Sequence, residues 1–151
     1  MKLLKSLITV ASIAVFAACK KNNTTIPTVV MSADVASSSW VSYQSRVTIS
    51  KTPTLHVTIA ADSATTHMQL DLGNYSGPGT YSLYDSANSA RYTAFYSGVG
   101  NVTHVATSGQ IVVTDNVLTS TGATEIKGTF KFLGDTLSVK NGAFDVMLYL
   151  N

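Results

Sequence analysis

The chain has 151 residues, of which 12% are charged, 45% are hydrophobic and one is cysteine. This length suits one domain and is too short for two, and the hydrophobic content excludes a wholly disordered chain. Charged residues occur at about half the usual frequency, whereas 18 Ser and 20 Thr supply most of the polarity, which favours β-strands joined by Ser-rich turns. Because the chain has no run of like charge, we expect no nucleic-acid partner.

The first 18 residues have the pattern of a secretory signal peptide. A basic start, Met1–Lys5, precedes 13 uncharged residues that end in small side chains, and this stretch is shorter than the roughly 20 residues that span a bilayer. The boundary Phe16-Ala17-Ala18-Cys19 resembles a bacterial lipobox, with Phe16 in place of the usual Leu. The resemblance implies that Cys19 is lipidated; the alternative is an ordinary signal peptide that leaves Cys19 as a free thiol.

Removal of residues 1–18 leaves a nearly neutral chain. Lys2 and Lys5 are lost, so eight basic residues remain against eight acidic ones. Residues 19–28 are mostly polar, as expected of a tether, and residues 29–151 form the predicted domain. Acyl chains on Cys19 would anchor the protein stably, and no acidic surface-export signal follows this cysteine. We therefore expect a lipid-anchored protein on the periplasmic side of the outer membrane.

The first part of the domain predicts a strand and a hairpin. Residues 41–50 alternate with a period of two, so they predict one continuous strand with a buried face formed by Val41, Tyr43, Val47 and Ile49. Residues 54–59 and 67–72 predict a hairpin across the polar loop 61–66. Its register would set apolar residues opposite one another: Leu55 with Leu72, Val57 with Leu70, and Ile59 with Met68.

The C-terminal third predicts a three-stranded meander. Its first strand, 125–132, has an inward face formed by Ile126, Gly128, Phe130 and Phe132. A tight connection at Leu133–Gly134 leads to a strand containing Leu137 and Val139. Asn141-Gly142 is the strongest short hairpin signal, because both turn positions need positive φ, and the last strand would run from Phe144 to residue 150.

Further strands are expected at residues 80–84, 91–96 and 110–114. Roughly nine or ten short strands and no long helix predict an all-β, single-domain antiparallel β-sandwich or closed barrel. The pattern leaves both architectures open.

Four groups of residues carry a family resemblance: Ala33-Asp34-Val35 with Trp40, Gly77-Pro78-Gly79-Thr80-Tyr81, Gly128-Thr129-Phe130-Lys131-Phe132, and Val139-Lys140-Asn141-Gly142-Ala143-Phe144. Over residues 30–150 the chain resembles a family of small β-rich bacterial outer-membrane lipoproteins of unknown function. The resemblance implies a β-rich fold and contributes no catalytic residues. Members usually have an Asn-Gly or Asp-Gly turn before the tryptophan, where this chain has Ala36-Ser37-Ser38-Ser39.

The predicted hairpin would bring His56 opposite Asp71 on its polar face, with His67 farther along. At about 3.3 Å per residue, His67 would lie more than about 10 Å from His56. We therefore expect an exposed His–Asp pair, and we predict no metal site and no cofactor. No Gly-x-Ser-x-Gly motif is present, and the seven Asp and one Glu are scattered, so we expect no enzymatic activity.

Aromatic residues are frequent between residues 75 and 96. Along 91–96, Tyr92 and Tyr96 share one face and Phe95 lies on the other, so one aromatic face would be less buried. Tyr92 and Tyr96 would then form a platform for a sugar ring; the alternative is core tyrosines with hydroxyls at the rim.

Three short segments, Asp62-Ser63-Ala64, Asp85-Ser86-Ala87 and Asp135-Thr136-Leu137, resemble a sequon for O-glycosylation of exported bacterial proteins. The resemblance implies modification at Ser63, Ser86 and Thr136. The alternative is ordinary turn chemistry of Asp followed by a hydroxyl residue.

The sequence favours a non-catalytic, lipid-anchored envelope module that binds a protein partner or acts as an accessory factor. A carbohydrate-binding module that uses Tyr92 and Tyr96 is the alternative. The first hypothesis predicts a smooth, hydroxyl-rich surface, and the second predicts exposed tyrosine rings.

Overall fold

The computed structural model describes residues 28–51, 54–83 and 92–149. These residues form eleven strands: β1 (Met31–Val35), β2 (Ser38–Ser42), β3 (Ser45–Ser50), β4 (His56–Ser63), β5 (Thr66–Leu72), β6 (Gly79–Leu83), β7 (Tyr92–Ser97), β8 (Thr103–Val105), β9 (Ser108–Leu118), β10 (Ala123–Leu133) and β11 (Ser138–Tyr149). In these ranges no helix is long and apolar enough to cross a membrane.

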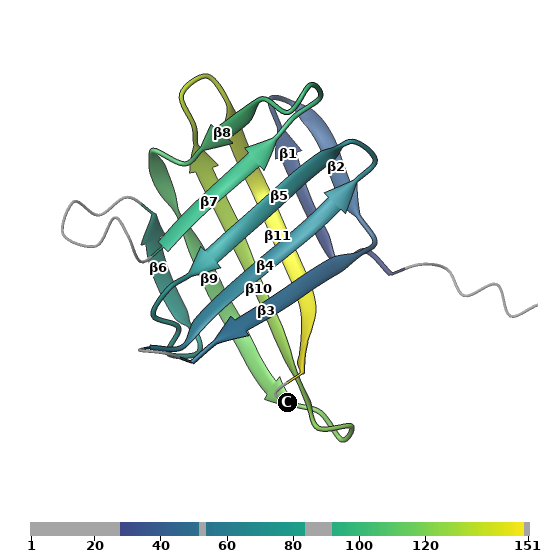
Figure 1. Ribbon diagram of the computed structural model, residues 1–151, viewed down its shortest axis with the longest axis vertical. Coiled ribbons are helices and arrows are strands. Elements are labelled where there is room, and N and C mark those ends of the chain that lie inside the picture. Colours follow the sequence, from purple (N-terminus) through teal and green to yellow (C-terminus); the bar gives the residue numbers. More distant parts are fainter. Residues whose placement is uncertain (1–27, 52–53, 84–91, 150–151) are drawn as a thin grey trace, which may run out of the picture.

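The strands form two antiparallel sheets that pack face to face (Figure 1). One sheet has six strands in the order β2-β1-β11-β10-β9-β6, and the other has five in the order β3-β4-β5-β7-β8. Neither sheet closes on itself, so the predicted all-β sandwich is confirmed and the closed barrel is wrong. The β9–β10 hairpin projects beyond the five-stranded sheet (Figure 1).

The core lies between the two sheets, where alternate side chains of each strand face inward. Val57, Ile59 and Leu70 of the five-stranded sheet are fully buried, as are Ile111 and Ile126 of the six-stranded sheet. Each such side chain contributes about 1.5–3 kcal/mol when removed from water. The alternation of apolar and polar residues is therefore the main determinant of the fold.

The segment predicted as one strand over 41–50 crosses from one sheet to the other. β2 ends at Ser42 in the six-stranded sheet, and β3 begins at Ser45 in the five-stranded sheet, so the single strand is wrong. Tyr43 lies in the crossover and is 53% exposed, not buried as predicted. Val41 was also placed on the wrong face, because Trp40 and Ser42 are the buried residues of β2 and Val41 lies between them. The shared parity of Val41 and Val47 concealed the break.

The buried hydroxyl of Ser42 holds this crossover in place. It accepts a hydrogen bond from the Gln44 amide at 3.2 Å, and it donates to the carbonyl oxygen of Asp62 or of Gln44. The hydrogen bond from Ser42 to the carbonyl of Asp62 connects the end of β2 to β4 of the opposite sheet.

The β4–β5 hairpin forms with a register two residues from the prediction. Val57 lies opposite Leu72, and Ile59 lies opposite Leu70. The connection is a two-residue turn in which Ala64 has a φ of 52°, shorter than the predicted loop. A shift of two residues keeps apolar side chains opposite one another, so the pattern alone was satisfied by both registers.

Asn141-Gly142 forms a bulge within β11 and not the predicted hairpin turn. β11 continues from Ser138 to Tyr149 and pairs with β10 on one side and β1 on the other. Asn141 has a φ of 50°, and its Nδ2 donates to Asp34 Oδ2 at 2.7 Å. The three-stranded meander is therefore wrong, because the left-handed backbone favoured by Asn serves a bulge as well as a turn.

The opening hairpin β1–β2 forms without an Asn-Gly or Asp-Gly turn. Ala36 and Ser37 make the turn with φ values of 47° and 73°. Non-glycine residues without a suitable polar side chain are strained in this region, so the double substitution Ala36→Asn with Ser37→Gly should raise the free energy of unfolding by about 1 kcal/mol. Urea denaturation measures the change. Ser39→Gly, in β2, is the control and should lower stability; a double variant no more stable than the wild type would contradict the prediction.

Two stacked tyrosines near the start of β6 differ in their hydrogen bonds. Their ring centroids lie 6.0 Å apart. The Tyr81 hydroxyl donates to the carbonyl of Gly77 and accepts from the Ser76 amide, whereas the buried Tyr75 hydroxyl has no partner among the described residues. We expect Tyr75→Phe to raise the free energy of unfolding by about 1 kcal/mol and Tyr81→Phe to lower it by about 1–2 kcal/mol. Changes of the same sign in the two variants would contradict this.

Burial, with a smaller contribution from Tyr81, raises the pKa of Tyr75 from 10.0 to about 12. The folded protein therefore holds this proton more tightly than the unfolded chain does. The resulting stabilisation is fully present below pH 10 and is lost as the pH rises from 10 to about 12. Tyr75→Phe should lose less stability than the wild type across this window, as measured by urea denaturation at each pH.

Candidate functional site

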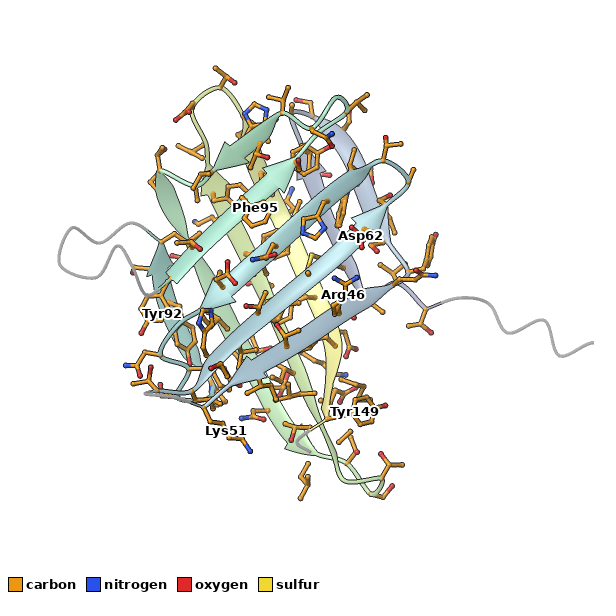
Figure 2. All side chains as sticks on the ribbon, viewed as in Figure 1. Arg46, Lys51, Asp62, Tyr92, Phe95 and Tyr149 are labelled. Carbon is orange, nitrogen blue, oxygen red and sulfur yellow. The ribbon has the colours of Figure 1, made fainter. Side chains whose placement is uncertain are left out.

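The outer face of the five-stranded sheet carries most of the polar residues that the sequence analysis selected (Figure 2). Antiparallel pairing aligns the outward-facing residues of this sheet, polar and apolar, in rows that run across the strands. The first row is Asp62, His67, Ser97 and Thr103; the second is Arg46, Ala60, Gln69, Phe95 and Val105; and the third is Thr48, Thr58, Asp71 and Thr93. Side chains within a row are direct neighbours.

The shifted β4–β5 register changes which histidine meets which aspartate. His67 lies opposite Asp62, with Nδ1 and Oδ1 2.7 Å apart, so its predicted position near Ala60 is wrong. His56 contacts Asp71 diagonally, at 3.7 Å between Nε2 and Oδ1, and does not lie directly opposite it. Across the described ranges, no three His, Cys, Asp or Glu side chains gather as a set that could hold a metal ion.

Asp71 is the centre of a hydrogen-bond network. Its Oδ1 accepts from the Thr58 hydroxyl at 2.6 Å, and its Oδ2 accepts from the Gln69 amide at 2.8 Å and the Thr93 hydroxyl at 3.2 Å. Both oxygens therefore have partners from three adjacent strands. The network stabilises the sheet and leaves little capacity for a ligand.

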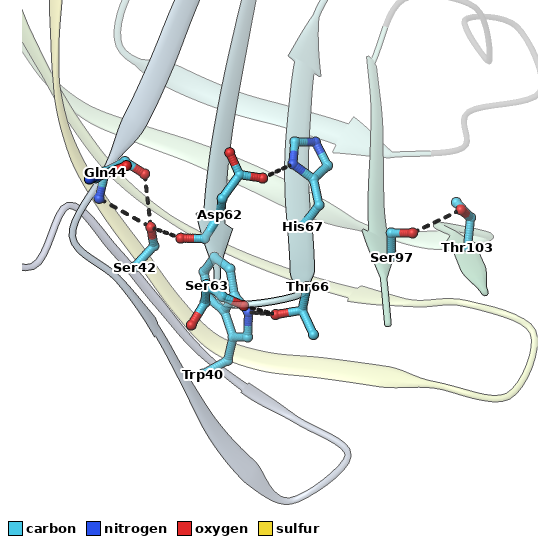
Figure 3. Close-up of polar contacts among 9 residues, drawn as sticks. All are labelled: Trp40, Ser42, Gln44, Asp62, Ser63, Thr66, His67, Ser97 and Thr103. Atoms are coloured by element: carbon cyan, nitrogen blue, oxygen red, sulfur yellow. Dashed lines mark hydrogen bonds and ion pairs between the residues drawn. The ribbon is translucent and has the colours of Figure 1, made fainter. Parts of the chain in front are cut away.

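Asp62, His67 and Ser97 stand side by side, an order like that of a charge-relay triad (Figure 3). The Ser97 hydroxyl, however, is hydrogen-bonded to Thr103 at 3.2 Å, and no hydrogen bond joins it to His67. The His67 ring packs on Phe95, with centroids 5.5 Å apart. The row lacks the serine–histidine hydrogen bond on which nucleophilic catalysis depends.

A cleft opens beside this row, where the chain passes between the sheets. It has a volume of about 360 Å³, and we call it the crossover cleft. Its lining consists of Val41, Ser42, Tyr43, Gln44, Asp62, Ser63 and Ala64. The volume lies within the range of small-molecule sites.

The walls of the crossover cleft come from both sheets. Ser42 joins β2 to β4, as described above, and the Trp40 indole Nε1 donates to the Thr66 hydroxyl at 2.8 Å (Figure 3). Thr66 in turn donates to the carbonyl of Ser63 at 2.7 Å, which closes the β4–β5 turn. These bonds link the turn to β2, so the cleft has a preorganised shape.

Two groups give the crossover cleft its chemistry. The Tyr43 ring is half exposed, and the Asp62 side chain is 61% exposed. His67 contacts Asp62 Oδ1, while Oδ2 makes no hydrogen bond to the described residues. An aromatic residue and a carboxylate with free acceptor capacity that line one cleft can hold the apolar face and the hydroxyl groups of one polar ligand.

Tyr43 was not predicted as a site residue, because the alternation over residues 41–50 placed it on a buried face. The signal was the run Ser42-Tyr43-Gln44-Ser45, in which three of four residues are polar and break the strand. Asp62 was considered only as part of a sequon.

Tyr92 and Tyr96 lie on the inner side of β7. Ala94 between them is fully buried, and both tyrosines are half-buried and pack against the core. Tyr92 contacts Tyr81 edge to face, with centroids 5.2 Å apart. They therefore do not form an outward-facing platform, because the alternation of β7 turns Phe95 outward instead.

The predicted modification sites have different surroundings. Ser63 is half-buried at the end of β4, and Thr136 is exposed in the loop between β10 and β11. Cys19 and Ser86 lie outside the described residues.

A second hollow, of about 350 Å³, lies on the six-stranded sheet and is lined by Gln110, Val112, Thr129, Phe130, Lys131, Asn141, Gly142 and Ala143. Its aromatic residue, Phe130, is buried. The crossover cleft is therefore the better candidate for a site that recognises a ligand by stacking.

Comparisons with characterised proteins and with solved structures find no match. One family model matches residues 27–146, a segment that spans the sandwich from the tether to β11 and includes the crossover cleft. That family carries the description Domain of unknown function, which agrees with the uncharacterised family expected from the sequence. The chain belongs to this family, Domain of unknown function (DUF6252).

Proposed function

We propose that this protein is a non-catalytic, lipid-anchored binding module of the bacterial outer envelope and that its crossover cleft binds a saccharide. The observation that carries the proposal is that the half-exposed Tyr43 and Asp62 line one cleft, and that Asp62 Oδ2 makes no hydrogen bond to the described residues. In this proposal Tyr43 replaces Tyr92 and Tyr96 as the aromatic residue that stacks on the sugar.

Saccharide chemistry fits these groups. A pyranose ring has an apolar C–H face that stacks on an aromatic side chain and hydroxyl groups that donate to a carboxylate. Ser63 and Gln44 line the same cleft and can donate and accept further hydrogen bonds. The volume of the cleft suits one or two sugar rings.

The place of the cleft is consistent with an envelope ligand. The Val30 amide donates to the carbonyl of Ser42 at 2.9 Å, so the chain enters the sandwich beside the cleft. If Cys19 carries lipid, the nine residues from Lys20 to Thr28 extend at most about 30 Å. The cleft would then lie close to a membrane surface. Thr136, exposed in its loop, remains the more accessible of the two described O-glycosylation candidates.

Binding of the full-length protein in detergent to a glycan array tests the proposal, followed by titration of the retained sugar. Tyr43→Ala and Asp62→Asn should each weaken binding by roughly tenfold or more, since each removes one of the two recognition groups. Tyr149→Ala, an exposed tyrosine at the far end of β11, is the matched control and should bind normally.

Two results would contradict the proposal. One is that no glycan is retained by the wild-type protein. The other is that Tyr43→Ala binds like the wild type while Tyr96→Ala binds more weakly, which would place the sugar site at β7.

A further inference from the structure

One edge of strand β9 has no partner strand among the described residues over five of its eleven residues. β6 pairs only with Gly109–Val113, because the chain enters β6 at Gly79, directly opposite Val113. Thr114–Leu118 form no backbone hydrogen bonds on that side to the described residues. We call these five residues the free edge of β9. A row of unpaired backbone groups is a template for another strand.

The side chains of the free edge are all exposed, and two are large and apolar. Val117 points to the outer face of the six-stranded sheet, in one row with Glu125 and Met147. Leu118 points to the inner side of the projecting end and is 71% exposed. Tyr149 lies at the same end of the molecule (Figure 2). Exposed apolar side chains therefore adjoin the unpaired backbone.

The charges beside the free edge are mostly negative. Asp115, Lys127 and Asp145 form one row across β9, β10 and β11. Lys127 already contacts Glu125 at 3.1 Å and Asp145 at 3.2 Å, and these two carboxylates raise its pKa. Asp115 forms no ion pair with the described residues and accepts only from the Thr114 hydroxyl. This part of the sheet thus carries three carboxylates and one ammonium group, which contacts only two of them.

This charge distribution favours a basic occupant. A second copy of the chain, paired edge to edge, would bring a second Asp115 into a region that is already acidic, and like charges on neighbouring strands are destabilising. A basic side chain opposite Asp115 would instead form an ion pair with its carboxylate.

We propose that the free edge of β9 binds an extended segment of a partner protein by strand addition. The segment runs antiparallel to β9, with apolar residues opposite Leu118 and Val117, a polar residue opposite Asn116 and a lysine or arginine opposite Asp115. Main-chain hydrogen bonds supply the affinity, and the alternating side chains supply the specificity. The assignment is independent of the crossover cleft, which lies elsewhere in the sandwich.

The probe is a peptide with this register, acetyl-Val-Val-Thr-Lys-Thr-amide, titrated into the full-length protein in detergent and followed by the backbone amide signals. The signals of residues 114–118 should shift and those of the β3 edge should not. Asp115→Lys should weaken binding roughly tenfold, and the same peptide with Glu in place of Lys should regain affinity for this variant. Thr48→Lys, which adds the same charge on the edge strand β3 of the five-stranded sheet, should bind like the wild type.

Three outcomes would overturn the proposal. The first is unchanged amide signals at about 5 mM peptide, where even a millimolar complex would be mostly formed. The second is equal affinity for the Lys and Glu peptides. The third is a concentration-dependent dimer, detected by sedimentation, that Val117→Lys dissociates, because a second copy would then be the occupant.

Discussion

Replacing Gly128 with alanine is expected to lower the free energy of unfolding by about 3 kcal/mol, because the added methyl group has no room in the core. Gly128 faces inward in β10, between Val113 of β9 and Phe144 of β11. An added Cβ would overlap the carbonyl oxygen of Val112 and the ring of Phe144. Neither can move freely, since one belongs to the paired backbone and the other fills the core.

Urea denaturation of Gly128→Ala and Gly79→Ala separates this steric effect from the general effect of replacing a glycine in a strand. A Cβ on Gly79 would meet no atom within 4 Å, so this control should change stability by less than about 0.5 kcal/mol. Equal losses in the two variants would show that close packing at Gly128 is not what requires glycine there.

Removing the Asp71 carboxylate, in Asp71→Ala, should lower the free energy of unfolding by about 2 kcal/mol. Thr58, Gln69 and Thr93 would lose their shared acceptor, and His56 would lose its 3.7 Å contact with Asp71 Oδ1. The Asp71 side chain is only 17% exposed, so water replaces these bonds poorly. The network links β4, β5 and β7, which is why the loss should affect the whole five-stranded sheet.

Asp62→Ala is the matched control, because Asp62 belongs to the other His–Asp pair. Its side chain is 61% exposed and, among the described residues, contacts only His67, so the loss should stay below about 1 kcal/mol. A larger effect for Asp62 than for Asp71 would contradict the assignment of Asp71 as the structural aspartate. The small expected cost also allows Asp62→Asn to be used in the binding experiment without loss of the fold.

The two aspartates therefore have different roles on one face of the sheet. Asp71 has a partner for each oxygen, whereas Asp62 Oδ2 has none among the described residues, and Asp62 lines the crossover cleft together with Tyr43. A group with unused hydrogen-bond capacity at a cleft is the better candidate for ligand recognition. The sequence treated both residues alike, because only the register distinguishes them.

Much of the fold follows from local patterns. The inward face of β10, the positions of β6 and β7 and the all-β architecture were predicted because alternation directly reports which side of a strand is buried. A family resemblance carried by turns and core aromatics agreed with this pattern.

Where the predictions were wrong, two structures satisfied the same local pattern. The β4–β5 register could shift by two residues without exposing an apolar side chain, and Asn141 could adopt its left-handed backbone in a bulge or in a turn. In both cases the choice depends on strands that are distant in sequence, such as β1 beside β11.

The sequence by itself determined which residues are buried along most strands, since burial follows the period of two and needs no knowledge of the partner strand. Only the tertiary structure decided that the chain changes sheets between Ser42 and Ser45, which exposes Tyr43 and forms the crossover cleft. The physical reason is that this change of sheet is held by contacts between distant residues, above all the Ser42 hydroxyl and the carbonyl of Asp62. Such contacts have no local periodicity, so the polar run from Ser42 to Ser45 can indicate a break in the strand but not which residue of the other sheet holds it.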